Sequence, residues 1–422
     1  MHFHRVMLLT CVAVAAAAAQ DLRPKDVREL AKGGSNALPK LQELLKNPDP
    51  DIRVEAVKAI TEIGTQRSLD PLILATQDND PEVQIRATDG LVNFYLPGYV
   101  QTGLGASLKR VGGSIKAKFT DTNDQVVDPY VMARPEVIAA LGKLARGGAD
   151  MEVRANAARA IGILRGKDAV PDLIEAIHTK DSAVIYESLN ALQKIRDQSA
   201  APRITFLLRD LDPKVQIAAI ETTGLLQNKE ALPDLVDALN RARDAKVRRA
   251  ALTAIAMLPA ESSRALYSRY LTDKDDKMRA GAAEGIARLR NPADLPMLEK
   301  AWQDEGKTPP RLALAFAQVM LGKLDTAEFS PLTYLINTLD SASYREVAQA
   351  YLIELARDER VRMALYASLN NATKDEKIGL ARVLARSGDK ESVSYLQKLS
   401  NDSDNEVAQE GQRALRTLQA RL

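Results

Sequence analysis

The sequence predicts an all-α solenoid, and three observations lead to this fold class. Segments with apolar residues at helical spacing begin about every 31 residues along most of the chain. An Asp precedes most of these segments, and a shorter helix-like stretch lies upstream of each. A length of 422 residues exceeds an ordinary single domain, but stacked repeats account for it without several separate cores.

The first nineteen residues are typical of a secretory signal peptide. Arg5 supplies the positive charge, residues 6–16 form a short apolar run, and Ala17 to Ala19 fit a small-residue cleavage site. Residues 1–19 are therefore predicted to be removed near Ala19, and the mature protein is expected to be exported, to the periplasm or the exterior. A buried N-terminal helix is the alternative interpretation.

Cys11 raises a further alternative, because the residues around it loosely resemble a lipoprotein acylation site. Thr10 fits that motif poorly, and the apolar run continues beyond the cysteine. Cys11 is the one cysteine of the chain. Cleavage near Ala19 would therefore leave a mature protein without disulfides, thiolate metal ligands or a cysteine nucleophile.

Seven of the repeated segments align without gaps. Their first residues are 31, 70, 31, 31, 32 and 31 residues apart, so the long interval contains one repeat plus 39 residues. This divides the chain into an N-terminal segment with two repeats at 20–96, a non-repeat insertion at 97–133 and the remaining repeats at 134–422. The seven segments begin at Asp49, Asp80, Asp150, Asp181, Asp212, Asp244 and Asp275.

Each repeat is predicted to be a helix, a tight turn and a second helix. In the third segment, Val153, Ala157, Ala160, Ile161 and Leu164 fall on one helical face. The Asp before that face suits an N-cap, because its carboxylate can accept hydrogen bonds from the free amides of the first turn. One unit cannot bury its apolar face alone, so the units are expected to stack. Proline is tolerated near the start of the shorter upstream helices, as at Pro71, Pro171 and Pro233.

About eleven repeats are expected in all. Two longer, degenerate repeats around residues 308–321 and 341–355 fill the interval after the seventh segment. The last two clear units lie at 374–388 and 404–418. The C-terminal helix, which ends in RALRTLQARL, is polar and fits a capping repeat.

The Asp-x-x-Val-Arg turn, as in Asp150 with Val153 and Arg154, and the Ala-rich second helix resemble the HEAT repeat family. The likeness is greatest to the short bacterial repeats of phycobilisome lyases, and it covers residues 36–96 and 134–422. It implies an armadillo-like α-solenoid, and it is weak for function because the same repeat serves many tasks. It also implies that a recurrent arginine bonds to turn groups of a neighbouring repeat, at Arg53, Arg154, Arg248 and Arg279.

The sequence offers no catalytic set, so the protein is predicted not to be an enzyme and to use no metal or cofactor. Two of its three histidines, His2 and His4, would leave with the signal, and His178 is interpreted as a surface residue at a helix end. Deoxyhypusine hydroxylases, which are HEAT-like, bind iron through His-Glu pairs, and this chain lacks such a pair. Phosphate-loop and nucleophile-elbow motifs are also missing. The rival hypothesis is an enzyme, or an enzyme subunit, of the HEAT-like lyase type that relies on carboxylates.

The charge balance does not favour nucleic acid as a partner. The 58 Lys and Arg residues nearly cancel the 56 Asp and Glu residues, which gives a net charge of +2. Nucleic-acid-binding proteins usually carry a strongly basic footprint.

The insertion is the main candidate binding site. Leu104, Leu108, Val111, Ile115 and Phe119 follow each other at steps of 4, 3, 4 and 4, which predicts one face of a helix, and no acidic residue lies between 103 and 120. Such a basic amphipathic helix suits an acidic protein surface or an anionic membrane. The candidate binding residues are Tyr99, Lys109, Arg110, Lys116, Lys118 and Phe119.

Two alternatives for the insertion remain open. Gly112 and Gly113 each disfavour a helix by about 1 kcal/mol relative to Ala, and the alternation in SIKAKFT fits a hairpin that turns at these glycines. The segment could also simply cover the apolar face of neighbouring repeats. A second candidate surface is aromatic, although core packing is the favoured interpretation of its residues, Tyr334, Tyr344, Tyr351 and Tyr366. Core packing is likewise favoured for Trp302.

Taken together, these features predict an exported, non-enzymatic scaffold that binds another protein, with the insertion as a specificity element. A peripheral membrane protein docked through the basic insertion is the other alternative.

Overall fold

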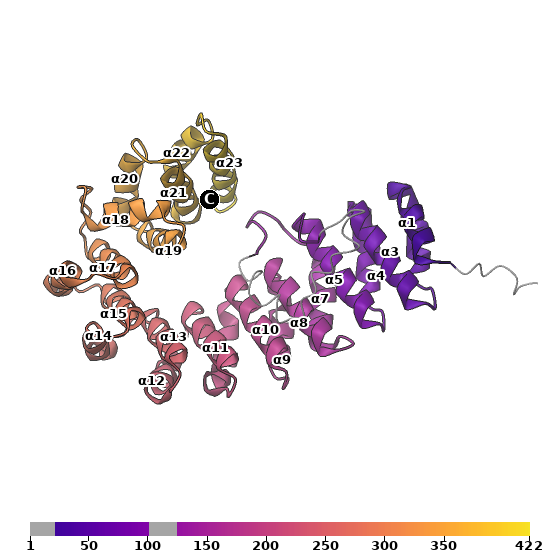
Figure 1. The fold of residues 1–422 in the computed structure, drawn as a ribbon, viewed down its shortest axis with the longest axis horizontal. Helices are drawn as coiled ribbons and strands as arrows, with labels where there is room; N and C mark the ends of the chain where they lie inside the picture. The colour runs from indigo at the N-terminus through magenta and orange to yellow at the C-terminus, as the bar shows by residue number, and fades with distance from the viewer. Residues whose placement is uncertain (1–21, 101–124) are drawn as a thin grey trace, which may run out of the picture. The chain divides into compact units, whose positions relative to one another are not determined.

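The protein is an all-α solenoid, as the sequence predicts. A computed structural model describes residues 22–100 and 125–422, and these residues form 22 α-helices joined by short turns and 3-10 segments, with no β-strand among them. The helices form two layers, and the repeats follow one another along the chain (Figure 1). The chain divides into two compact units, which are described separately below.

Unit 1 contains residues up to Val126 together with Ala133–Ala176. Helices α1, α3, α5 and α8 pack in series as its inner layer, and α2, α4, α7 and α9 cover them as the outer layer. The bounds are α1 Pro24–Ala31, α2 Leu38–Leu44, α3 Pro50–Ile63, α4 Leu69–Ala75, α5 Pro81–Tyr95, α7 Pro135–Gly147, α8 Met151–Ile163 and α9 Val170–Ala176.

Unit 2 contains Ile177–Leu422 and, in addition, the short segment Val127–Met132. Its inner layer runs α10, α11, α13, α15, α17, α19, α21 and α23, and the outer layer alternates with it. The inner helices are α10 Ser182–Ile195, α11 Pro213–Leu225, α13 Ala245–Ala256, α15 Asp276–Arg288, α17 Thr308–Met320, α19 Arg345–Leu355, α21 Lys374–Ser387 and α23 Asn405–Gln419. The outer helices are α12 Leu232–Arg241, α14 Arg264–Tyr270, α16 Leu295–Asp304, α18 Pro331–Asn337, α20 Glu359–Ser368 and α22 Ser392–Leu399.

All seven aspartates at the start of the aligned segments are N-caps. Their carboxylates accept hydrogen bonds from amides of the first helical turn, for example from Val153 to Asp150 at 2.8 Å and from Lys246 to Asp244 at 2.7 Å. The other five caps have the same geometry. An Asp-to-Ala change at an N-cap typically lowers helix stability by about 1 kcal/mol, so these residues fix where each inner helix begins.

The predicted apolar face of the third repeat is the buried face of α8. Val153, Ala157 and Ile161 have no exposed surface, and Ala160 and Leu164 are almost as well buried. The helices predicted around 308–321 and 341–355 also exist, as α17 and α19, and both lie in the inner layer of unit 2. The prediction of degenerate repeats in this region is therefore confirmed.

One outer element differs from its equivalents. Between α10 and α11 the chain forms two 3-10 segments, Gln198–Arg203 and Thr205–Arg209, instead of an α-helix. Pro202 lies inside the first of them. Where another outer helix contains a proline, that proline occupies an early position, such as Pro233 in α12. Pro202 comes late enough to remove a helical amide and to clash with the preceding turn, so the α-helix cannot continue through it.

A left-handed residue ends several inner helices. Gly64 (φ 56°) follows α3 and Gly322 (φ 106°) follows α17, but the corresponding residue after α10 is Arg196 (φ 58°) and after α15 it is Arg290 (φ 55°). Left-handed backbone disfavours a non-glycine residue by roughly 1–2 kcal/mol. Arginine thus occupies turns of unit 2 where glycine would be less strained.

Replacing Gly285 by alanine is expected to destabilise the protein, although alanine is the better helix former. Gly285 lies in α15, and an added Cβ would stand 2.3–2.6 Å from ring atoms of Tyr267. Tyr267 cannot easily withdraw, because it is fully buried and its hydroxyl donates to the Ile255 carbonyl at 3.0 Å. Overpacking of this kind is worth about 1–3 kcal/mol, which exceeds the gain of about 1 kcal/mol in helix propensity. Urea unfolding followed by circular dichroism would measure the difference.

The matched control is Gly147→Ala at the end of α7, where an added Cβ meets nothing within 4 Å. That variant is expected to be neutral or slightly stabilising. Equal stability of the two variants would contradict the packing argument.

Candidate protein interface

Most of the predicted binding residues lie in the insertion, outside the described residues. These are Lys109, Arg110, Lys116, Lys118 and Phe119. The choice between helix and hairpin for that segment also falls outside the described part of the chain. Tyr99 is described: it is half-buried after the end of α5, and its amide donates to the Leu96 carbonyl at 3.1 Å.

Two of the four recurrent arginines have the structural role that the sequence predicts. Arg53 donates to the Asn47 carbonyl of its own turn at 2.9 Å and to the Asp78 carboxylate of the next repeat at 2.7 Å. Arg279 makes the same pair of contacts, with the Asp273 carbonyl at 2.8 Å and Glu305 at 2.7 Å. These side chains join successive repeats, so they are not available as an anion-binding stripe.

The other two recurrent arginines differ from this pattern. Arg154 donates to the Ala145 carbonyl of its own repeat at 3.1 Å rather than to a neighbouring repeat. Arg248 is the other exception: its neighbour Arg249 contacts the next repeat instead, through an ion pair of 2.6 Å with Asp275. A shift of one residue along a helix changes the direction of a side chain by about 100°, which explains why only one of the two arginines reaches the next repeat.

The predicted tyrosine cluster belongs largely to the core. Tyr351 is buried, stacks on Phe316 with ring centroids 4.7 Å apart and donates to Glu284 at 2.7 Å. Tyr366 is buried and stacks on Tyr395 at 3.9 Å. These two residues confirm the core interpretation, so the cluster does not form a continuous aromatic surface.

The remaining two tyrosines are half-buried, and one of them packs around the tryptophan. Tyr334 meets Trp302 edge-on with ring centroids 5.1 Å apart, and the Arg311 guanidinium lies 4.3 Å from the Trp302 ring centre.

The predicted surface position of His178 is confirmed: it is exposed just beyond α9 and stacks on Phe206 with centroids 5.0 Å apart. These contacts assign packing roles to Trp302 and His178.

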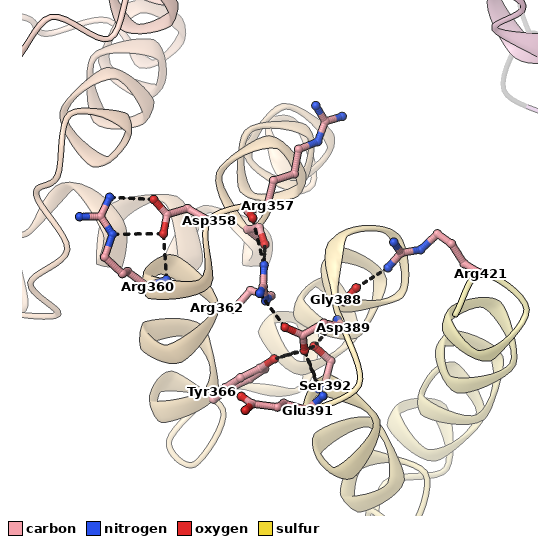
Figure 2. Close-up of polar contacts among 11 residues, drawn as sticks. Arg357, Asp358, Arg360, Arg362, Tyr366, Gly388, Asp389, Glu391, Ser392 and Arg421 are labelled. Carbon is pink, nitrogen blue, oxygen red and sulfur yellow. Dashed lines mark hydrogen bonds and ion pairs between the residues drawn. The ribbon is translucent and has the colours of Figure 1, made fainter.

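The turns that follow the inner helices α19 and α21 carry a dense polar network (Figure 2). Arg362 donates to the Ala356 carbonyl at 2.8 Å and to Asp389 at 2.6 Å. Asp389 in turn accepts from the Ser392 amide at 3.2 Å, and Arg421, just beyond α23, donates to the Gly388 carbonyl. The network ties the C-terminal repeats together at one edge of unit 2.

Arg357 lies in the same turn, and its carbonyl accepts from Arg362 at 3.1 Å, but its side chain takes no part in this network. Figure 2 shows its side chain extending away from the network. It is exposed, and among the described residues no carboxylate forms an ion pair with it. Its neighbour Arg360, by contrast, is paired with Asp358 at 2.8 Å. The turn and the start of α20 thus contain paired arginines, whereas the Arg357 side chain forms no ion pair within the described ranges.

A short non-repeat segment is bound to the last inner helix of unit 2. Asp128 accepts from Arg413 Nε at 3.0 Å and from Arg413 Nη2 at 2.6 Å, which makes a bidentate pair. The Tyr130 hydroxyl donates to the same carboxylate at 2.9 Å, and the guanidinium of Arg416 lies 5.8 Å from the centre of the Tyr130 ring. We call these four residues the α23 clamp. Its geometry combines fork-shaped carboxylate recognition with a cation–π contact.

The electrostatics of the α23 clamp favour the ionised pair. Burial raises the pKa of Asp128, but the hydrogen bonds from Arg413 and Tyr130 and the charge of Arg413 outweigh it, so the net pKa is lowered. The pKa of Arg413 is raised, chiefly by its hydrogen bonds to Asp128. Burial and then the bond to Asp128 raise the pKa of Tyr130. The folded state therefore binds this carboxylate in its charged form.

Replacing Asp128 by asparagine is expected to loosen the segment at neutral pH. Because the pKa of Asp128 is lowered on folding, its contribution is present above the ordinary value of about 3.9 and disappears as pH falls through the folded value. A half-exposed pair of this kind is worth about 1 kcal/mol or less. Amides of residues 127–132 should therefore exchange up to roughly fivefold faster in the variant at pH 7, as measured by hydrogen–deuterium exchange. Below about pH 4 the difference from the unmodified protein should diminish.

The control is Asp325→Asn, the same change at an exposed carboxylate between α17 and α18. It should leave exchange at residues 127–132 unchanged. Unaltered exchange in Asp128→Asn at pH 7 would show that the segment is held by other contacts.

Sequence reasoning did not find the α23 clamp. Asp128 and Arg413 are 285 positions apart, and neither belongs to the repeat pattern that identified the other structural residues. The available signals were an Asp-Pro-Tyr sequence within the non-repeat stretch and two arginines in the capping helix, and no rule of spacing connects them.

Within the described residues, no helix is long and apolar enough to cross a membrane. The same residues contain no group of three or more His, Cys, Asp or Glu side chains placed to hold a metal ion.

Several solved structures align with this chain at low identity. The complex of CpcE and CpcF of phycocyanin lyase from Nostoc sp. PCC7120 aligns at 18% identity, over 65% of this chain and 94% of that one, with a TM-score of 0.39. Human deoxyhypusine hydroxylase aligns at 18% identity, over 68% and 97%, with a TM-score of 0.28. A mutant of Kap121p aligns at 14% identity, over 94% and 47%, with a TM-score of 0.40.

No curated protein matches this sequence. The HEAT repeats family matches residues 10–92, 138–209, 201–265 and 234–318, which together make up more than half of the chain. These matches coincide with the helix pairs whose N-caps, buried faces and inter-repeat arginines are described above. The chain therefore belongs to the HEAT repeat family.

Proposed function

We propose that this chain is an exported, non-enzymatic HEAT-repeat scaffold that binds another protein on its inner helices. The observation that carries the proposal is the α23 clamp, in which an inner helix holds a non-repeat segment through Arg413 and Arg416. An inner helix that binds a segment of its own chain in this way has the chemistry needed for a partner's segment. Export is proposed from the signal-like residues 1–19.

The use of the buried charged residues supports a non-enzymatic role. Arg288, Glu284, Glu354 and Tyr351 satisfy one another between α15 and α19, and Asp389 serves the turn network. These groups hold helices together, which is what a scaffold requires of them.

Crosslinking in an envelope extract tests this proposal. Residues 20–422 would be used as bait, and lysine crosslinks to any stoichiometric partner would be mapped by mass spectrometry. The expected result is one protein crosslinked mainly to the inner helices of unit 2. Recovery of no stoichiometric protein, or crosslinks confined to outer helices, would overturn the proposal.

A second bait separates the insertion from the repeats. Replacing residues 101–124 by a short linker keeps the α23 clamp intact. Loss of the partner with an unchanged melting temperature would make the insertion the specificity element, whereas retention would place recognition on the repeat surface.

A further inference from the structure

The edge of unit 2 at which inner helices pass into outer helices carries arginines whose side chains form no ion pair with any described residue. Arg196 follows α10, Arg290 follows α15, Arg357 follows α19, and Arg386 lies in the last turn of α21. All four are exposed, and within the described chain none of their guanidinium groups has a hydrogen bond or an ion pair, although the charge of Arg290 helps to lower the pKa of Asp358. We call these residues the arginine edge.

Their arrangement follows from the solenoid itself. The inner helices α15, α17, α19 and α21 pack in series, and they run in the same direction, so their C-terminal ends lie along one edge. The negative end of each helix dipole tolerates a positive charge there. At the equivalent turn after α17, Lys323 is paired with Glu299, so the free charges belong to particular repeats.

Two observations indicate that these side chains are not simply solvated. Arg196 and Arg290 adopt left-handed backbone, with φ of 58° and 55°, where Gly322 stands after α17. Arginine therefore occupies two strained turns, and Gln227 occupies a third after α11 with φ of 57°. Partial burial and then the charges of Arg386 and Arg357 lower the pKa of Arg196, so Arg196 is repelled by two other arginines of the edge in the absence of an anion.

We propose that the arginine edge is a binding site for an acidic segment of a partner protein. This inference rests on the proposed scaffold function and gives the partner a chemical class. Adjacent packed helices lie about 8–10 Å apart, and an extended chain advances about 3.3 Å per residue. Two carboxylates three residues apart would therefore meet the neighbouring ends of α19 and α21, which carry Arg357 and Arg386.

Nucleic acid and membrane surfaces fit the edge less well. The net charge of +2 lacks the basic footprint of a nucleic-acid-binding protein. A membrane site needs apolar residues beside the basic ones, whereas the neighbours along this edge are polar or small, as at Asp197, Asn291, Asp358, Ser387 and Gly388.

Fluorescence anisotropy with residues 20–422 tests the assignment. The probe is a fluorescein-labelled peptide with glutamate at every third position. The test variant carries Arg196→Gln, Arg357→Gln and Arg386→Gln. We expect the unmodified protein to bind the peptide less tightly as salt rises, and the variant to bind roughly tenfold more weakly.

The matched control removes three arginines of unit 2 that are as exposed but already paired. These are Arg209 with Asp234, Arg241 with Asp237, and Arg360 with Asp358. The two triple variants have the same net charge, so a difference between them cannot come from total charge. The control should keep most of its affinity for the peptide, because its three arginines are already paired. An unchanged helical spectrum would show that each variant is folded, and Arg357→Gln alone provides a milder version of the test.

Three results would overturn the proposal. The first is that the peptide does not bind, and the second is that the two triple variants lose equal affinity for it. The third is that the test variant binds the peptide normally but loses affinity for a single-stranded RNA or for phosphatidylglycerol vesicles. The crosslinking experiment distinguishes this failure from failure of the scaffold function. If the envelope partner remains bound to the test variant, the arginine edge is not its site, while the scaffold function stands.

Discussion

Replacing Arg288 by alanine is expected to lower the free energy of unfolding of the protein by about 3 kcal/mol. Arg288 is largely buried and joins two inner helices of unit 2: it donates to Glu354 of α19 at 2.8 Å and to Glu284 of its own helix, α15, at 3.0 Å. Its guanidinium also lies 5.1 Å from the Phe316 ring centre. Alanine would leave two carboxylates without their shared counter-charge, and such uncompensated charge is the costly part of breaking a buried pair.

The pKa directions support this expectation. Burial lowers the pKa of Arg288, but its bonds to the two carboxylates outweigh burial and raise it. Burial and the neighbouring Glu284 raise the pKa of Tyr351 well above its ordinary value, so the phenol remains a proton donor to that carboxylate. Each member of the group is therefore held in the protonation state that its partners require.

Urea unfolding monitored by circular dichroism would measure the effect of Arg288→Ala. Arg360→Ala is the control, because this arginine is 71% exposed and its pair with Asp358 is worth about 1 kcal/mol or less. A variant that also carries Glu284→Gln and Glu354→Gln should regain part of the lost stability, because the buried negative charges are removed. Similar unfolding midpoints for Arg288→Ala and Arg360→Ala would show that the buried network contributes little.

The repeat fold could be predicted because its determinants are local. An Asp that caps a helix and an apolar face at helical spacing both lie within about fifteen residues of each other, as in Asp150 followed by Val153 and Ile161. The 3-10 segments after α10 also have a local signal, since Pro202 falls too late in the sequence to begin a helix. These features depend on the chain nearby and on little else.

The network around Arg288 and the α23 clamp depend on distances that spacing does not encode. Arg288 reaches Glu354 66 residues away, past α17, so the contact requires both the curvature of the stacked helices and the length of the side chain. Arg357, in the turn before α20, and Arg360, in the first turn of α20, have the same side chain, yet only Arg360 forms an ion pair with a carboxylate of the described residues. Which arginines remain free for a partner is thus decided by packing, and it emerges only from the structure.

Truncation of Phe316 to alanine is expected to have the other large effect, a loss of about 3–5 kcal/mol of unfolding free energy. Phe316 is completely buried in α17, between α15 and α19. Its ring stacks on Tyr351 and lies beneath the guanidinium of Arg288. Removal would leave a cavity under the charged network as well as the lost apolar burial, and the rigid inner helices can fill such a space only in part.

Phe329→Ala supplies the matched control, because the same atoms are removed from a side chain that is 84% exposed. Its effect should stay within about 0.5 kcal/mol.

The change at Phe316 should also be non-additive with Arg288→Ala, since the two side chains are in contact and share Tyr351 as a neighbour. A thermodynamic cycle of the two single variants and the double variant, measured by urea unfolding, would quantify that coupling. Strict additivity would mean that α17 stabilises unit 2 only by filling space, whereas a coupling above about 0.5 kcal/mol would show that its aromatic ring supports the ion pairs that link α15 to α19.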